Sequence, residues 1–148
     1  MVSFEDFLSL SLLNSAYWAI ADGCSEQPVE TLFARAAHLK LGSVDLRGGE
    51  AIHLFFSQRA LKNEQSARVT RHISSAFVPA EYAGDVVSVR STVAVFAGNG
   101  ELPIPSDVPS TIADVEDVFV RSDDGKWLFQ SRFISPIFVG ASAAAFAR

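Results

Sequence analysis

The stretch Arg68–Val78 reads RVTRHISSAFV, and here the apolar pattern of the chain changes to a period of two. Alternation of this kind predicts a β-strand, which we place over residues 67–81. Segments 85–98, 111–122 and 126–139 share the period and are rich in β-branched or aromatic residues, so they predict three further strands. The turn DDG before the last of them predicts an antiparallel hairpin.

The first part of the chain has the period of helices. Ser3 is a suitable N-cap, apolar residues follow at steps of three and four, and Gly23 ends the pattern, which predicts a first helix. We expect a second helix from Ser25 or Gln27 through residue 36, and a third over 49–62.

Short segments connect these elements. Residues 38–42 alternate like a short strand and 45–49 read as a turn. Residues 98–110 hold three of the six prolines and predict a long loop that forms a rim or lid, and 140–148 predict a weakly ordered tail. The sequence therefore predicts one α+β domain over 1–148, with a core over about 3–139, in which three N-terminal helices pack on an antiparallel sheet.

Composition narrows the classes of function. The chain of 148 residues carries a net charge of −5 without a basic patch along the sequence, which argues against nucleic-acid binding. Twelve phenylalanines indicate a wide core or a cavity walled by aromatic rings. Cys24 is the only cysteine, so no internal disulfide or cysteine-rich metal site is expected. The apolar N-terminus begins with acidic residues, so we expect neither a signal peptide nor a membrane helix but a cytoplasmic protein.

Motifs for the common catalytic chemistries are missing. The three histidines lack zinc-site spacing, and neither a G-x-S-x-G elbow nor a glycine-rich phosphate loop occurs, so no metal or nucleotide cofactor is expected. Acid–base chemistry remains, with Asp22 at the end of the first helix, His72 on the first long strand and Arg132 on the last as candidates. Histidine transfers protons near neutral pH, and arginine holds an anion or developing negative charge.

Each candidate also has a purely structural interpretation. Asp22 is a polar residue at a helix end, although a negative charge is unfavourable at that end of the helix dipole. His72, which shares a strand face with Thr70 and Ser74, is a core histidine in this interpretation. Arg132 is the ion-pair partner of an acid on the neighbouring strand, for which the sequence offers Asp117 and Glu116. The alternation of its strand places Arg132 on one face with Leu128, Gln130 and Ile134.

Several segments together resemble a known family. They are YWAIADG, GGEAIHLFF, TRHISSAFV, VVSVRSTVAVF and VEDVFVRSDDGKWLFQSRF. Over residues 3–139 the chain resembles the SnoaL-like branch of the nuclear transport factor 2-like (cystatin-like) superfamily, and the last three segments are also similar to small β subunits of aromatic-ring-hydroxylating dioxygenases. The resemblance implies a curved antiparallel sheet that wraps around helices as a cone, a pocket at its open end, and a homodimer through the outer sheet face.

The resemblance also implies roles for single residues. Some enzymes of this fold, scytalone dehydratase among them, use an aspartate–histidine pair at the positions of Asp22 and His72, and a dehydrochlorinase of the fold has a pocket arginine at the position of Arg132. Four aromatic residues would contact the substrate: Tyr17, Trp18, Phe55 and Phe56. Related polyketide cyclases instead use an acid on a late strand, where Asp114 and Asp117 stand.

Two functions follow as hypotheses. The first is a cofactor-free lyase, isomerase or cyclase that acts on a small hydrophobic or aromatic molecule through His72 and Asp22, with Arg132 and Tyr17 orienting the substrate. The second is a ligand-binding or assembly module without chemistry, such as a structural partner of an oxygenase large subunit.

Overall fold

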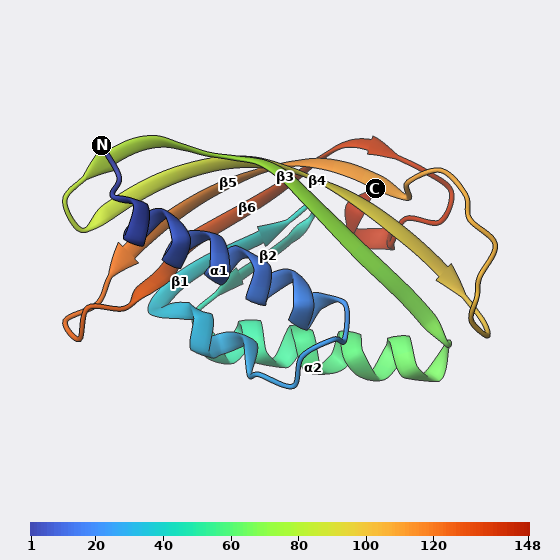
Figure 1. Cartoon of the computed structure of the whole chain (residues 1–148). Coiled ribbons are helices and arrows are strands. Elements are labelled where there is room, and N and C mark those ends of the chain that lie inside the picture. The colour runs from blue at the N-terminus through green and yellow to red at the C-terminus, as the bar shows by residue number, and fades with distance from the viewer.

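Two α-helices and one six-stranded sheet make up the fold in the computed structural model, which describes residues 1–148 (Figure 1). The helices are α1 (Phe4–Ala21) and α2 (Gly49–Gln65), and the 3-10 turns are η1 (Val29–Leu32) and η2 (Ala145–Ala147). The strands are β1 (Phe33–Leu41), β2 (Val44–Arg47), β3 (Arg68–Ala83), β4 (Val86–Asn99), β5 (Thr111–Arg121) and β6 (Trp127–Val139). The predicted α+β class and the four long strands are confirmed.

The sheet is curved and unclosed, and α1 runs along its concave side (Figure 1). Its strand order is β2-β1-β6-β5-β4-β3, and β3 to β6 are antiparallel neighbours as expected. The prediction of a wholly antiparallel sheet is wrong at one pair, because β1 pairs with β6 in parallel. A strand from the first third of the chain thereby supplies the hydrogen bonds that β6 would otherwise lack at a bare edge.

The prediction of three helices is also wrong. Only η1 forms where a second helix was expected, and Ala34–Ala36 lie in β1. Most of the expected turn at 45–49 belongs to β2 (Val44–Arg47), which pairs with β1 after the turn at Gly42 and Ser43. Pairing with β6, far away in the sequence, outweighs the local helical pattern, because it buries Phe33 and Leu39 against the core.

Helix α1 begins and ends where the sequence predicts. The Ser3 hydroxyl accepts a hydrogen bond from the Asp6 amide at 3.0 Å, and Gly23 adopts a φ of +68° just after the helix. Asp22 is the C-cap residue of this helix and directly precedes Gly23. No helix of the structure combines the length and the apolar character needed to cross a membrane.

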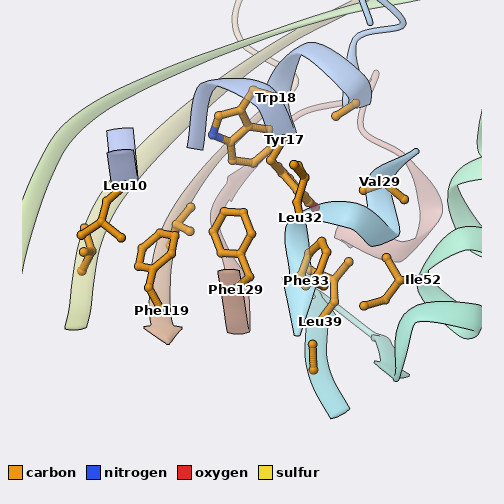
Figure 2. Close-up of a cluster of buried hydrophobic side chains, with 14 of the residues drawn as sticks. Leu10, Tyr17, Trp18, Val29, Leu32, Phe33, Leu39, Ile52, Phe119 and Phe129 are labelled. Carbon is orange, nitrogen blue, oxygen red and sulfur yellow. The ribbon is translucent and has the colours of Figure 1, made fainter. Parts of the chain in front are cut away.

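The core between α1 and the inner sheet face combines aliphatic side chains with a cluster of aromatic rings (Figure 2). Phe129 of β6 lies at its centre, with its ring centroid 4.7 Å from that of Phe119, 5.1 Å from Phe33 and 5.9 Å from Tyr17. Burying one such ring stabilises the fold by about 1.5–3 kcal/mol, and the edge-on contacts add to this. Four of the twelve phenylalanines are buried in this core, namely Phe33, Phe56, Phe119 and Phe129.

Replacement of Phe129 by alanine tests this centre. The side chain is fully buried, so we expect Phe129→Ala to lower the free energy of unfolding by about 3–5 kcal/mol. Denaturant titration measures the change. Phe4 is 82% exposed, and Phe4→Ala should change stability by less than about 0.5 kcal/mol; equal losses in the two variants would contradict the assignment of the core.

Candidate active site

A cavity of about 450 Å³ opens beside the core, between the two helices and the inner face of the sheet. Its volume is within the range of pockets that hold small molecules. The four aromatic residues expected to contact a substrate all line it, namely Tyr17, Trp18, Phe55 and Phe56. The C-terminal segment Ala144–Ala147 lies over one side of the cavity. Of the loop that follows β4, only its last residue, Ser110, lies in the wall.

His72 lines this cavity and contacts Asp22, which lies outside the wall. Asp22 Oδ1 lies 2.6 Å from Nδ1 of His72, and the backbone N–H of His72 donates to Asp22 Oδ2 at 2.9 Å. The Thr70 hydroxyl donates to Oδ1 at 2.8 Å. The carboxylate therefore favours the His72 tautomer that carries its proton on Nδ1. The His72 ring lines the cavity, and its Nε2 atom has no hydrogen-bond partner in the protein.

All three histidines contact a carboxylate, and burial distinguishes them. The His38–Asp45 and His53–Glu30 pairs include side chains that are 49% and 56% exposed, whereas the side chains of His72 and Asp22 are 10% and 7% exposed. His72 is also the only histidine that lines the cavity. No group of three or more histidine, cysteine or acidic side chains gathers in the structure.

Trp18 fixes the plane of the imidazole. Its ring stacks on that of His72 with centroids 4.6 Å apart and an angle of 17° between the planes. The indole N–H in turn donates to Asn14 Oδ1 at 3.0 Å, and the Asn14 amide donates to Ser74 on β3 at 3.2 Å. One turn of α1 thus restricts the rotamer of the His72 side chain and fixes the plane of its ring.

The ionisation of Asp22 reflects its partners. Burial opposes the charged form, but the hydrogen bonds from His72 and Thr70 and the positive charge available on His72 outweigh burial and lower the pKa of Asp22. The carboxylate is therefore charged at neutral pH. These donors also offset the unfavourable position of an anion at the C-terminal end of α1.

Asp22→Asn should destabilise the protein in a pH-dependent way. A folded-state pKa below the unfolded value, about 3.9, means that the charge of Asp22 stabilises the fold above that pH and that this stabilisation is lost as the pH falls through the folded-state pKa. We expect Asp22→Asn to cost about 1.5–3 kcal/mol at neutral pH, and the difference from the unaltered protein to shrink below about pH 4. Denaturant titrations across pH measure this, with the exposed Asp123→Asn as a control without effect. A cost that grows on acidification would contradict the assignment.

Arg132 lies behind the cavity wall. Its side chain is fully buried, it does not line the cavity, and its guanidinium binds both carboxylate oxygens of Asp117 at 2.8 Å. It also donates to Asn14 at 2.5 Å and packs on the rings of Tyr17, Trp18 and Phe129 at 4.3–5.0 Å. Of the two acids that the sequence offered as partners of Arg132, the structure thus selects Asp117.

The strand face predicted for Arg132 is wrong in part. Along β6 the register shifts at Gln130, because Val118 pairs with Ser131 while the next residue, Phe119, pairs with Phe129. The extra residue reverses the alternation, so Arg132 shares the inner face with Phe129 rather than with Leu128 and Gln130. The late-strand acids of related cyclases do not reach the cavity either, since Asp114 is exposed and Asp117 is paired with Arg132.

Asp117→Ala should be among the most destabilising single changes. It leaves the Arg132 charge buried without its counter-ion, and breaking such a pair costs about 3–5 kcal/mol. The double variant Asp117→Leu, Arg132→Met removes both charges and should lose less stability than Asp117→Ala alone. Thermal and denaturant unfolding compare the variants; a loss below about 1 kcal/mol for Asp117→Ala would mean that the pair is not buried as described.

Tyr17 brings an unpaired hydroxyl to this part of the molecule. The residue is fully buried and lines the cavity, yet its Oη atom has no hydrogen-bond partner. Burial raises the pKa of Tyr17 to about 12, so the hydroxyl keeps its proton. A buried donor without a partner is unfavourable unless a ligand or water completes it.

The sequence did not single out several residues that build the site. Thr70 and Asn14 bind the key side chains, and Arg59 and Arg68 line the cavity. The sequence places Thr70 two residues before His72 on the same strand face but gives it no role. The others come from distant elements, and no local spacing connects them.

Comparisons with known proteins agree with this architecture. The sequence model described as SnoaL-like domain matches residues 3–133. ActVI-ORFA from Streptomyces coelicolor superposes with a TM-score of 0.76 at 16% identity, over 90% of this chain and 96% of that one. A candidate scytalone dehydratase from Novosphingobium aromaticivorans DSM 12444 gives 0.70 at 16% identity, over 88% and 83%. A candidate aromatic ring hydroxylase from Novosphingobium aromaticivorans gives 0.76 at 18% identity over both full lengths. No protein with a curated description matches the sequence.

Proposed function

The chain belongs to the SnoaL-like domain family, and we propose that it is a cofactor-free lyase, isomerase or cyclase that acts on a small hydrophobic or aromatic molecule. The observation that carries the proposal is the 2.6 Å contact between Asp22 and Nδ1 of His72 at the wall of an apolar cavity, with Nε2 left free. An imidazole is suited to proton transfer when it is held in one tautomer and its second nitrogen faces a cavity.

In the proposed reaction, His72 Nε2 takes a proton from a carbon atom next to a substrate carbonyl. The electron pair of that C–H bond moves onto the carbonyl oxygen and gives an enolate. The Asp22 carboxylate stabilises the imidazolium that forms, because it already accepts a hydrogen bond at Nδ1. Return of the proton to another carbon gives isomerisation, loss of a β-substituent gives elimination, and attack of the enolate carbon on a second carbonyl gives cyclisation.

The walls supply binding and orientation. Trp18, Phe55 and Phe56 present apolar surface to a planar substrate, and burial against them favours aromatic compounds. The Tyr17 hydroxyl is buried beside the cavity without a partner, so it would donate to a substrate oxygen only after the side chains around it move. Arg132 acts as a positioning residue: it packs on Trp18 at 5.0 Å, and Trp18 stacks on His72.

Deuterium exchange into an enolisable aromatic ketone tests the proposal without knowledge of the natural substrate. With 2-tetralone in D₂O, the protein should accelerate loss of the C–H signals next to the carbonyl, measured by proton NMR. General base catalysis contributes about 10²–10⁴-fold, so His72→Gln should reduce the protein-dependent rate by about 100-fold or more.

The control for this experiment is His53→Gln, which alters an exposed histidine–carboxylate contact outside the cavity. It should keep the full exchange rate, and melting temperatures of both variants separate loss of catalysis from loss of fold. Equal rates in the His72→Gln and His53→Gln proteins would sink the proposal. Binding of the ketone without exchange would instead favour a ligand-binding module.

A further inference from the structure

Three basic residues line the cavity without any acidic residue in its wall. Arg59 and Lys62 come from the last turns of α2, and Arg68 begins β3. The chain as a whole is acidic, with 17 aspartates and glutamates against 12 lysines and arginines. A quarter of its basic residues thus gather at one cavity whose wall contains no aspartate or glutamate. Such a distribution focuses positive potential inside the cone. Arg59 and Arg68 also line a neighbouring hollow, whose acids are Asp22, Glu26 and Glu64.

None of the three takes part in an ion pair. Arg59 donates one hydrogen bond, to the carbonyl oxygen of Ala21, and Arg68 donates one to Ser142 O at 2.8 Å. A guanidinium has five N–H donors, so most donors of both residues have no partner in the protein. The nearby Asp22 carboxylate is already occupied by Thr70 and His72.

Arg59 shows the electrostatic cost of this arrangement. Burial lowers its pKa and outweighs the opposing effects of Tyr17 and Asp22, and the positive charge of Arg68 adds a smaller lowering. A half-buried cation is normally paired. The negative end of a helix dipole favours a nearby cation, which explains the position of Lys62 at the end of α2 and of Arg59 beside the end of α1. It does not account for Arg68, which lies at the start of a strand.

We propose that the cavity takes an anionic substrate: an aromatic carboxylic acid whose rings lie against Trp18, Phe55 and Phe56 and whose carboxylate lies between Arg59, Lys62 and Arg68. This inference rests on the proposed function, because the ligand is a substrate only if the protein is an enzyme. The binding itself does not require catalysis. Arginine is suited to the role because its fork of donors matches a carboxylate.

The strand geometry gives the length of the ligand. Arg68, Thr70 and His72 occupy alternate positions of β3 and therefore point to the same side of the sheet. Residues four apart on a strand have Cα atoms about 13 Å apart. An acid bound at the basic end therefore reaches the imidazole with its opposite end when two or three fused rings separate its carboxylate from the reacting carbon.

Binding of acids and of their methyl esters tests the proposal. The probes are three pairs of rising size: benzoic acid, 2-naphthoic acid and anthracene-2-carboxylic acid, each with its methyl ester, titrated at pH 7 by calorimetry. In at least one pair the acid should bind about tenfold or more tightly than the ester. Arg68→Met and Arg59→Met should each remove most of that preference and leave the affinity for the ester within about twofold.

The matched control is Arg90→Met, which alters an exposed arginine on β4 outside the cavity and should keep the preference. Ester binding in the Arg68→Met protein shows that the cavity is intact. The proposal is overturned if no acid binds better than its ester in any pair, or if Arg90→Met and Arg68→Met weaken acid binding equally.

His72→Gln separates the two proposals: it should keep the preference for the acid while abolishing exchange. Acid preference without exchange in the unaltered protein refutes only the catalytic proposal, and exchange without acid preference refutes only this one.

Discussion

The buried ion pair between Arg132 and Asp117 is the constraint on which the rest of the site depends. A charge removed from water needs its counter-ion and hydrogen-bond partners close by, and here Asp117 and Asn14 of α1 bind Nε and Nη2 of Arg132, while its Nη1 has no partner. The carbonyl oxygen of Asn14 also accepts from Trp18. Because directional bonds join the sheet to α1 at this point, the helix cannot rotate without breaking them. The same turn of α1 then determines where Trp18 lies against His72.

Asp22 follows from this anchoring. It stands one helical turn beyond Trp18, at the end of α1 where the helix dipole disfavours an anion. The strand β3 compensates it with a hydroxyl, a backbone N–H and an imidazole, all within 3 Å. A residue that is unfavourable locally but fully satisfied by a distant strand is typical of functional sites, where local preferences yield to tertiary demands. The mismatch that the sequence shows at Asp22 is thus resolved by contacts that only the fold provides.

Elements with a strong period were predictable, and elements made by distant pairing were not. The long strands, α1 and α2 follow from local alternation and capping, and the family resemblance supplied the meeting of Asp22 with His72. The sequence could not reveal that Ala34–Ala36 would join β1, because the parallel partner of that strand lies in β6. A single extra residue at Gln130 inverted the predicted face of its strand. Register shifts of this kind leave no mark in a hydrophobic pattern.

The three cations of the cavity illustrate why charge must be assessed in space. Along the chain, Arg59, Lys62 and Arg68 lie in one stretch with Glu64 and several amides, and the net charge of the chain is negative. In the fold the three line one cavity whose wall contains no acidic residue, although Arg59 and Arg68 also line a neighbouring hollow that includes Glu64. A ligand with one charged end would then be oriented by a single strong interaction, while aromatic walls constrain only its plane. Orientation of this kind selects which carbon atom meets the free nitrogen of His72, and so links a binding preference at one end of the cavity to the choice of reaction at the other.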